Sequence, residues 1–521
     1  MNKTFSFFAA AAATILAISC QPSDPSIVKT KDGLVQGHME EGTLAFKGIP
    51  YAEIERFMAP KPVTPWDTVM VCEKWGPQVM QNTGRELPPD VMNEQGSCVL
   101  NVWTTDTKAK KPVMLWIHGG GFDSGSSNGN PGMGLAKKDV VLVSLNHRLN
   151  ILGFLDLSQF GEKYRYSANA GMLDIVMALQ WIQDNIRNFG GDPDNVTIFG
   201  ESGGGGKVGT LMCMPSAKGL FHKAIIMSGT ILNINEKDMT EALGAAVLKE
   251  LGIAPEDVDK IQDVPYRELY DAGQRAMANS IGRRTPGTPM MWGFGPVPDG
   301  ETLLQQPFQD NLASISNDVP LMIGTTFNEL QRAIYNMEGE LSFDDAKPML
   351  EPVFGDLTDE LISEFQKAYP GWTAKDLVSM DRMFRPKTLI CADAITKERT
   401  ADTWMYMFDW KSPVSGASVH GNELAFCFNT LHLAPGQNPE PTEADLKLAD
   451  IMSDSWANFA KTGNPNVAGQ PEWHPYTSEN GELFVYDYEC EIKNNFDRRV
   501  QEIMNACCFR QLDEFRASRN K

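Results

Sequence analysis

Basic residues are scarce in this chain of 521 residues, where 46 Lys and Arg stand against 67 Asp and Glu. The resulting formal charge of −21 gives a surface that repels phosphate backbones. This balance excludes nucleic acid as a partner. It gives at most a mild preference for neutral or cationic small molecules.

Metal-binding motifs are absent as well. The sequence has no H-E-x-x-H motif and no cysteine pair with the spacing of a zinc site. Residues 192–195 begin like a calcium loop, but glycine is missing from the sixth position and glutamate from the twelfth. We expect neither a metal ion nor another cofactor.

Long apolar runs are confined to the N-terminus, where Lys3 precedes an almost unbroken apolar run from Phe5 to Ile18. That run is shorter than the about 20 residues that span a bilayer. It is typical of an export signal that is removed from the mature protein. We therefore assign residues 1–20 to the signal, 21–27 to a short tether and 28–521 to a single domain.

Cys20 closes this segment directly after Ser19, as the cysteine does in the signal of a bacterial lipoprotein. In such a signal the cysteine is lipidated and becomes the new N-terminus, although Leu16 stands one position further away than usual. Simple release into the periplasm and a chance cysteine are the alternatives. We expect an exported bacterial protein, in the periplasm or in the outer membrane as a lipoprotein, with secretion as the alternative. It would contact a membrane only through this lipid.

Eight further cysteines fit an exported chain, because some of them should pair in an oxidising compartment. Two stand side by side rather than in a C-x-x-C arrangement. Apart from the pair considered below, their pairing stays open. The eight are Cys72, Cys98, Cys213, Cys391, Cys427, Cys490, Cys507 and Cys508.

Short apolar strands alternate with helical patterns along the chain. Residues 112–117 and 140–145 are continuous apolar runs, typical of strands that are covered on both faces. Residues 169–188 carry an apolar stripe at helical spacing. Further strands are expected at 28–37 and 42–50, which together suggest one hairpin, and at 196–199, 223–227, 319–325 and 404–410.

This alternation predicts an α/β protein with a mostly parallel central sheet flanked by helices. The long connection from about residue 233 to 315 is rich in helical patterns. We expect it to form a helical cap or lid over the carboxyl edge of the sheet. The sequence contains no internal repeat and no flexible linker, so one catalytic domain is the simplest organisation.

A Gly-x-Ser-x-Gly motif occupies residues 200–204, between the expected strand 196–199 and a helical segment. This is the context of a nucleophile elbow, in which a strained turn lifts the Ser202 hydroxyl to a helix N-terminus. Backbone N–H groups there can stabilise an oxyanion. A phosphate-binding P-loop is excluded, because it would need glycine at Glu201 and Ser or Thr at Val208. A Gly-rich structural turn is the alternative.

A second Gly-rich motif, His118-Gly-Gly-Gly-Phe122, follows the buried strand that ends at residue 117. Loops of this type present backbone N–H groups to a developing oxyanion. Three glycines let the backbone approach a substrate carbonyl that side chains would block. A simple connector is the alternative.

Four histidines follow Ser202, and a triad of this order needs one of them after an acid. His222 begins the next strand, and His432 and His474 lie among loop residues without small neighbours. His420 lies in a loop of small residues after the expected strand 404–410, where an α/β sheet places its site. We therefore favour His420 as the base.

The chain resembles the type-B carboxylesterase family, which includes para-nitrobenzyl esterases, cholinesterases and the non-enzymatic neuroligins, and whose members have the α/β-hydrolase fold. The likeness runs from Val28 to about Tyr488 and is highly specific. Its carrying segments are Phe46–Tyr51, Cys98–Trp103, Asn146–Leu149, Asn185–Ser202, Pro296–Gly300 and Trp456–Gly463.

The resemblance implies Glu329 as the triad acid, in a segment that reads G-T-T-F-N-E-L, where the family has G-T-x-x-D-E-G. It places the family histidine of H-G-x-E at His420. It also implies an oxyanion hole made by the N–H groups of Gly120, Gly121 and Gly203. The family usually has alanine at the last of these positions.

The resemblance further implies supporting roles for several residues. Ser228 matches a serine that can hydrogen-bond the triad acid, and Glu201 adjoins the nucleophile in many relatives. Arg148 and Asp174 match a buried ion pair. Cys72 and Cys98 match a disulfide that closes a loop. A purely structural role is an equal alternative for each.

Together these features predict a serine carboxylic-ester hydrolase that acts through a Ser-His-Glu triad and an acyl-enzyme intermediate. A small-molecule ester is the expected partner. Amide or peptide hydrolysis by the same triad is one alternative, and a non-catalytic binding module, as in the neuroligins, is another. The oligomeric state and the identity of the ester are not indicated by the sequence.

Overall fold

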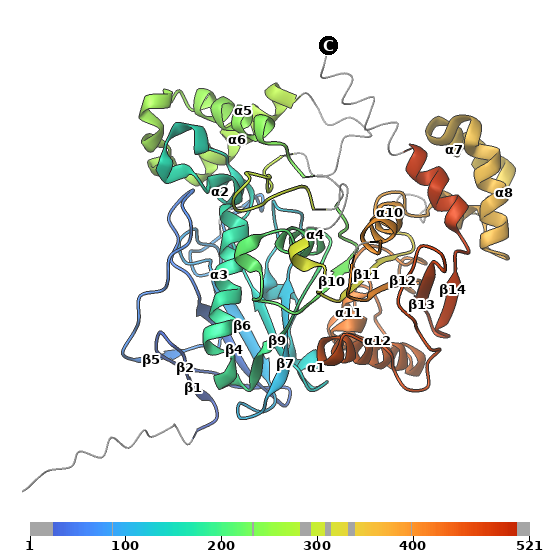
Figure 1. Ribbon diagram of the computed structural model, residues 1–521, viewed down its shortest axis with the longest axis horizontal. Helices are drawn as coiled ribbons and strands as arrows, with labels where there is room; N and C mark the ends of the chain where they lie inside the picture. Colours follow the sequence, from blue (N-terminus) through green and yellow to red (C-terminus); the bar gives the residue numbers. More distant parts are fainter. Residues whose placement is uncertain are drawn as a thin grey trace, which may run out of the picture.

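The computed structural model describes residues 24–85, 87–231, 234–281, 293–307, 314–331, 339–397 and 399–507 (Figure 1). The expected signal at 1–20, the start of the tether, Cys20 and Cys508 lie outside the described residues. Within the described part, no helix combines the length and the apolar character needed to cross a membrane.

The centre of the described chain is a sheet of eleven strands in the order β14-β13-β12-β11-β10-β9-β7-β8-β6-β4-β3. The seven strands from β13 to β8 in this order run parallel to one another. Antiparallel strands complete the sheet at both ends. The predicted, mostly parallel sheet is therefore correct. The strands are β3 (His38–Glu40), β4 (Thr43–Pro50), β6 (Val99–Thr104), β7 (Lys111–Ile117), β8 (Val141–Leu145), β9 (Gly191–Glu201), β10 (Lys223–Met227), β11 (Leu321–Thr326), β12 (Thr403–Phe408), β13 (Glu482–Tyr486) and β14 (Glu491–Asn494).

Helices cover both faces of this sheet (Figure 1). They are α1 (Met133–Ala136), α2 (Asn150–Phe154), α3 (Ala170–Asn185), α4 (Gly203–Leu211), α5 (Lys237–Glu250), α6 (Tyr266–Ile281), α7 (Phe343–Phe354), α8 (Thr358–Ala368), α9 (Ala374–Val378), α10 (Arg385–Ile395), α11 (Leu424–Cys427) and α12 (Glu443–Thr462).

Strand β7 shows why its sequence is continuously apolar. Its residues alternate between the two faces of the sheet. Val113 and Leu115 pack into the core that contains α3, whereas Met114 and Trp116 pack into the core that contains α12. A strand covered on both sides has no polar face, so the continuous run at 112–117 correctly indicated a central strand.

The N-terminal strands differ from the single hairpin that we expected at 28–37 and 42–50. Strand β1 (Ile27–Lys29) pairs with β2 (Leu34–Gln36), and β5 (Val69–Val71) completes a separate three-stranded sheet. Strand β3 pairs instead with β4 in the main sheet. The chain changes sheet at Gly37, where a Cβ would lie 2.4 Å from the Ala45 carbonyl oxygen. The two backbones thus approach too closely there for a side chain.

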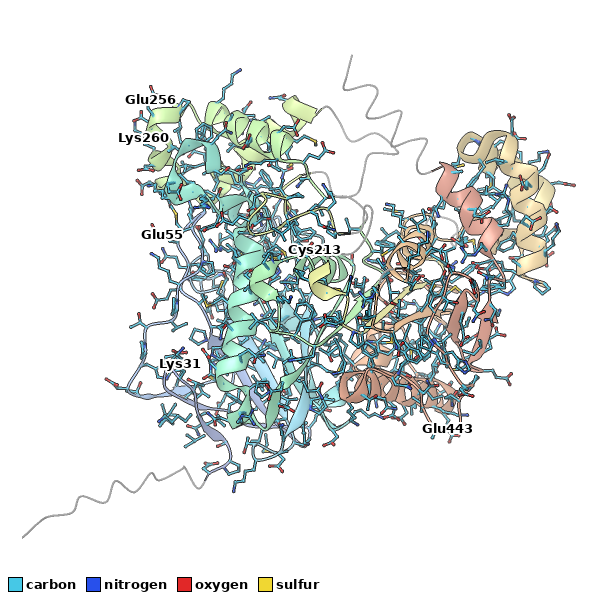
Figure 2. The ribbon with its side chains drawn as sticks, viewed as in Figure 1. Lys31, Glu55, Cys213, Glu256, Lys260 and Glu443 are labelled. Carbon is cyan, nitrogen blue, oxygen red and sulfur yellow. The ribbon has the colours of Figure 1, made fainter. Side chains whose placement is uncertain are left out.

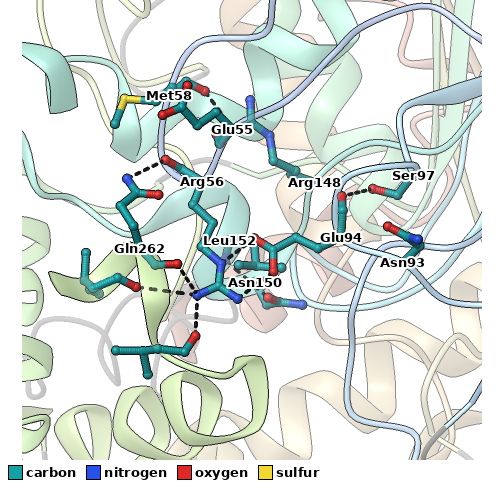
Figure 3. A network of polar contacts seen from close by, with 12 residues as sticks. Glu55, Arg56, Met58, Asn93, Glu94, Ser97, Arg148, Asn150, Leu152 and Gln262 are labelled. Atoms are coloured by element: carbon teal, nitrogen blue, oxygen red, sulfur yellow. Dashed lines mark hydrogen bonds and ion pairs between the residues drawn. The ribbon is translucent and has the colours of Figure 1, made fainter. Parts of the chain in front are cut away.

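The long connection after β10 is helical, as predicted, and contains α5, α6 and the 3-10 segment η7 (Pro255–Asp263). Figure 1 shows α5 and α6 beyond α4, at the end of the molecule to which the parallel strands run. Arg56 ties this insertion to the N-terminal part (Figure 3). Its guanidinium pairs with Glu94 at 2.7 Å and donates to the Gln262 carbonyl at 3.2 Å. Movement of the insertion as a lid stays a prediction.

Cys72 and Cys98 correct one expectation, because both are free thiols and the implied disulfide is not formed. Both thiols belong to one buried core cluster, and Cys98 also contacts the Tyr51 hydroxyl. Burial raises the pKa of Cys72 to about 12 and raises the pKa of Cys98 well above its usual range. Buried thiols in such surroundings act as small apolar side chains. Among the described residues no disulfide is formed, and Cys213 lies deep inside the molecule (Figure 2).

Arg148 and Asp174 form the ion pair that the resemblance implied, and both are almost completely buried. The guanidinium binds both carboxylate oxygens, at 2.8 and 2.6 Å. Its remaining N–H groups donate to the carbonyls of Glu55 and Met58 (Figure 3). Arg148 therefore joins the loop after β8, helix α3 and the segment after β4. Every charge in this contact is compensated.

Replacing Asp174 with asparagine should lower the free energy of unfolding by about 3–5 kcal/mol, because it leaves the buried Arg148 guanidinium without its counter-ion. Urea unfolding followed by circular dichroism measures the change. Lys31→Ala is the matched control, since Lys31 pairs with Asp184 at the periphery and is 68% exposed (Figure 2). We expect that variant to keep the wild-type midpoint. Equal midpoints for Asp174→Asn and wild type would contradict the role of the pair.

Candidate active site

Ser202 lies at the turn between strand β9 and helix α4, with φ 57° and ψ −124°. A positive φ is strained for a residue with a side chain, and such strain clusters at functional sites. The turn is held in place because the Ser202 N–H donates to the Met227 carbonyl of β10 at 2.8 Å. The sheet therefore fixes the serine in the conformation that the Gly-x-Ser-x-Gly motif predicted.

The glycines around Ser202 are required by close packing. A Cβ on Gly200 would lie 2.4 Å from the Gly204 carbonyl carbon, and one on Gly204 would lie 2.0 Å from the Ile117 carbonyl oxygen. A Cβ on Gly203 would lie 2.2 Å from the Gly121 carbonyl oxygen. The turn thus rests directly on the end of β7 and on the loop that follows it.

The loop at 119–121 lies against this turn and leaves its amides unoccupied. Gly120 and Gly121 have φ values of 89° and 65°, which a residue with a side chain rarely adopts. Among the described residues, the N–H groups of Gly120, Gly121 and Gly203 donate no hydrogen bond. Gly203 begins α4, so its N–H has no partner within the helix. Three unpaired donors are therefore available beside Ser202.

Glu329 follows strand β11 and is completely buried. It has φ 48°, a second strained residue at the site. One carboxylate oxygen accepts from the Ser228 hydroxyl at 2.6 Å and from the Thr326 N–H at 2.8 Å. Ser228 thus lies where the resemblance placed it. These two bonds fix the carboxylate and leave its second oxygen for another donor.

His420 takes that second oxygen, because its Nδ1 contacts Glu329 Oε2 in a short hydrogen bond. The backbone adds a further link, from the His420 N–H to the Glu329 carbonyl at 3.0 Å. Asn328 joins the same two loops, since its side-chain oxygen accepts from the Ser418 N–H at 2.9 Å. Asn328 stands where the family has aspartate, and it holds the histidine loop against the acid loop.

Glu201 approaches the opposite side of the imidazole. Its Oε1 lies 3.1 Å from His420 Nε2, and its side chain is 8% exposed. The Ser202 hydroxyl makes no hydrogen bond within the described residues, and the imidazole Nε2 faces Glu201, the residue just before the serine, instead. Catalytic hydrogen bonds are often loose in unliganded sites and tighten with substrate.

The electrostatics of the site favour a charged imidazole. Burial opposes the charge on His420, but the carboxylates of Glu329 and Glu201 outweigh it and raise its pKa to about 10. Burial, with help from Glu329, raises the pKa of Glu201 to about 7. The imidazole is therefore strongly basic, and the proton affinity of Glu201 is tuned to neutral pH.

Three residues near the imidazole were missed by the sequence reasoning. Glu423 is completely buried, with neither carboxylate oxygen hydrogen-bonded in the described residues, and burial raises its pKa well above the usual range. The Phe384 ring stacks on the imidazole at 5.0 Å between centroids. Asp381 accepts from the Phe384 N–H at 2.9 Å. Only Glu423, as the last residue of H-G-x-E, had a signal in the sequence.

The other candidate histidines have separate partners. His222 accepts from the Val196 N–H at 3.1 Å, near the start of β10. His432 is 53% exposed and lies 3.4 Å from Glu41, and His474 lies 3.2 Å from Glu482. None of these contacts involves the Ser202 turn. His420 as the base stays a prediction, and of the four rings it is the one that contacts the residue next to Ser202.

The arrangement suits acyl transfer. A serine on a strained turn directly follows a glutamate that lies 3.1 Å from a basic imidazole. A buried carboxylate orients that imidazole, and unpaired amides lie beside the serine turn. These are the parts that a nucleophilic mechanism requires.

Comparisons with family models, with curated proteins and with solved structures all point to the same family. The model of the carboxylesterase family matches residues 24–504. The para-nitrobenzyl esterase of Bacillus subtilis (strain 168) is 36% identical over 489 residues, which are 90% of this chain and 96% of that protein. An esterase structure from Clostridium hathewayi has a TM-score of 0.83 at 35% identity, over 94% of this chain and 99% of that one. A structure of PNB esterase has a TM-score of 0.76 at 32% identity, over 92% and 99%.

Replacing Glu201 with glutamine should lower the pKa of His420 by about one unit or more, because it removes a carboxylate 3.1 Å from Nε2. NMR titration of histidine labelled with ¹³C measures this pKa directly. Glu423→Gln is the comparison, since Glu423 also raises the pKa of His420 but contributes less than Glu201, so its removal should lower that pKa by less. A drop in Glu423→Gln as large as in Glu201→Gln would show that the assignment to Glu201 is wrong.

Proposed function

This chain belongs to the carboxylesterase family and is a carboxylic ester hydrolase of the α/β-hydrolase fold, and we propose that it acts through Ser202, His420 and Glu329 by an acyl-enzyme intermediate. The observation that carries this proposal is the contact between His420 Nδ1 and a Glu329 carboxylate that is itself fixed by Ser228 and Thr326. Small-molecule esters are its substrates.

In the first step, Ser202 Oγ attacks the ester carbonyl while His420 Nε2 removes the hydroxyl proton. The imidazole becomes imidazolium, and Glu329 keeps the ring in the tautomer that has its proton on Nδ1. The imidazole has to be neutral to accept this proton, and the carboxylates that raise its pKa stabilise the imidazolium that then forms. Contact of Nε2 with Ser202 Oγ requires the imidazole to turn away from Glu201 as the substrate binds.

The negative charge on the former carbonyl oxygen needs donors that are already in place. The N–H groups of Gly120, Gly121 and Gly203 meet this need, because no described residue occupies them. Preorganised amides stabilise an oxyanion without reorganisation. Collapse of the tetrahedral species then transfers the proton from His420 to the alcohol, which leaves.

In the second step, water takes the place of the alcohol. His420 removes a proton from the water, which attacks the acyl-enzyme carbonyl, and the same amides hold the second oxyanion. The bond to Ser202 Oγ then breaks, His420 returns its proton to that oxygen, and the acid leaves the restored enzyme. No cofactor takes part.

We further propose that the protein is exported and anchored through lipid on Cys20. The basic Lys3, the apolar run from Phe5 to Ile18 and the cysteine directly after it support this proposal. The protein would then be held at a membrane in the bacterial periplasm, with its catalytic domain in the aqueous phase.

Replacing Ser202 with alanine should reduce kcat for p-nitrophenyl acetate by about 10⁴–10⁶-fold, because the nucleophile is lost. Absorbance of released nitrophenol measures the rate. A matched pair of nitrophenyl ester and nitroanilide substrates separates esterase from amidase activity, and we expect turnover of the ester to dominate. Equal rates for wild type and Ser202→Ala would remove Ser202 from the mechanism.

Replacing Cys20 with serine should move the protein from the membrane fraction to the soluble periplasmic fraction, because the lipid acceptor is lost. Labelling with radioactive palmitate in a bacterial host, followed by fractionation, gives the result. Cys213→Ser is the control and should leave labelling unchanged, since Cys213 is buried in the folded domain. Incorporation of label into Cys20→Ser would contradict the anchor.

A further inference from the structure

Lys207 is a completely buried lysine on the first turns of helix α4, five residues after Ser202. The mechanism above does not use it. Among the described residues no carboxylate pairs with its amine. Burying a lysine without a counter-ion is unfavourable, so a residue kept in such a place is a candidate for function.

The amine of Lys207 contacts both ends of the glycine loop. Nζ donates to the His118 carbonyl oxygen at 3.0 Å, and it lies 5.5 Å from the centroid of the Phe122 ring. His118 and Phe122 are the residues on either side of the three glycines at 119–121. The Lys207 side chain therefore contacts the residue before the three glycines and the residue after them.

The loop needs such a support because it can supply little of its own. Glycine has no side chain to pack, and it has more backbone freedom than any other residue. The Ser124 N–H donates to the Gly120 carbonyl at 3.1 Å, and the Asn150 N–H donates to the Phe122 carbonyl at 2.7 Å. These other hydrogen bonds therefore hold mainly the C-terminal half of the loop. The neighbouring turn also consists of glycines, at 203–206, and Lys207 is the first residue after them that has a side chain.

Two titratable rings near Lys207 lie in the loops after two strands of the sheet. His118 follows β7 and His147 follows β8, and their rings stack at 5.1 Å between centroids. Burial lowers the pKa of His118 to about 3 and that of His147 well below its usual range, so both rings are neutral. Burial also lowers the pKa of Lys207 to about 7. Charged or neutral, the amine keeps N–H groups for the His118 carbonyl.

We propose that Lys207 is a positioning residue for the oxyanion hole. Its amine holds the 119–121 loop through the hydrogen bond to the His118 carbonyl and the contact with the Phe122 ring. It acts through the Gly120 and Gly121 amides and does not touch the substrate. The proposal rests on the proposed function, in which those amides bind the oxyanion. A misplaced donor weakens binding of the tetrahedral species more than binding of the flat ester.

The test replaces Lys207 with methionine, which keeps the length of the side chain and removes the amine. With p-nitrophenyl acetate, kcat should fall by about 10–100-fold, less than the about 10²–10³-fold lost with a whole oxyanion donor. KM should stay within about twofold, because ground-state binding does not use the loop amides. The inhibition constant of an aryl trifluoromethyl ketone, which forms an oxyanion on Ser202, should rise by the same factor as kcat falls.

Lys223→Met is the matched control. Lys223 is also a buried lysine, 8% exposed, but it begins strand β10 and contacts Asn195, at the far end from the Ser202 turn. Its kcat, KM and ketone inhibition should equal those of wild type. If Lys207→Met does not fold, Lys207→Gln is measured by the same criteria, since its shorter side chain loses the contact with Phe122.

Unchanged kcat and ketone inhibition in a folded Lys207 variant would overturn the proposal. So would a fall in kcat without a parallel loss of ketone binding, or a rise in KM alone. These outcomes require that Ser202→Ala first abolishes the turnover of wild type. Ester turnover that survives in Ser202→Ala would instead refute the proposed function, and the two failures are therefore distinguishable.

Discussion

Close contact between two stretches of backbone is the constraint on which the site depends. The turn at 200–204 lies against the end of β7 and the loop at 119–121, so closely that a Cβ on Gly203 or Gly204 would overlap a carbonyl oxygen. The turn follows β9 and the loop follows β7, and both of these central strands are buried on both faces. This burial fixes their register in the sheet. This contact requires a series of glycines, and neighbouring residues must restrict the backbone conformational freedom of these glycines. The hydrogen bond from Ser202 to β10 does this for the turn, and the proposed grip of Lys207 does it for the loop.

Buried carboxylates set the chemistry of the imidazole. Glu329 and Glu201 lie on opposite sides of His420, with Glu423 nearby, and all three are at least nine-tenths buried. Such a cluster is tolerable because the partners divide the charge unequally. Glu329 receives hydrogen bonds from Ser228 and Thr326, whereas Glu201 and Glu423 have raised pKa values. The result is an imidazole with a higher pKa than free histidine, bound through Nδ1 to one carboxylate.

Departures from the family pattern are accommodated by local contacts. Asn328 replaces an aspartate and still links the acid loop to the histidine loop through Ser418. Gly203 replaces the usual alanine and lets the glycine loop lie closer than a methyl group would permit. Cys72 and Cys98 form no disulfide, and both thiols are buried in the core cluster. The framework of the site therefore survives changes at positions where a side chain only supports the backbone.

Motifs with a local cause were readable from the sequence alone. The elbow at Ser202, the glycine loop and the buried strands each follow from residues that are adjacent in the chain, because steric limits on a turn or a strand act over a few positions. The likeness to the family added Glu329, since no local pattern distinguishes that glutamate from others. Tertiary structure alone decided that the first strands form two sheets, that Phe384 stacks on His420 and that the Lys207 amine lies under the glycine loop. Phe384 and His420 are 36 positions apart in the chain, and Lys207 and His118 are 89 positions apart. The division of the first strands between two sheets depends on which edge of a sheet is free. Sequence periodicity carries no information on such pairs, because packing across the core is set by the whole fold.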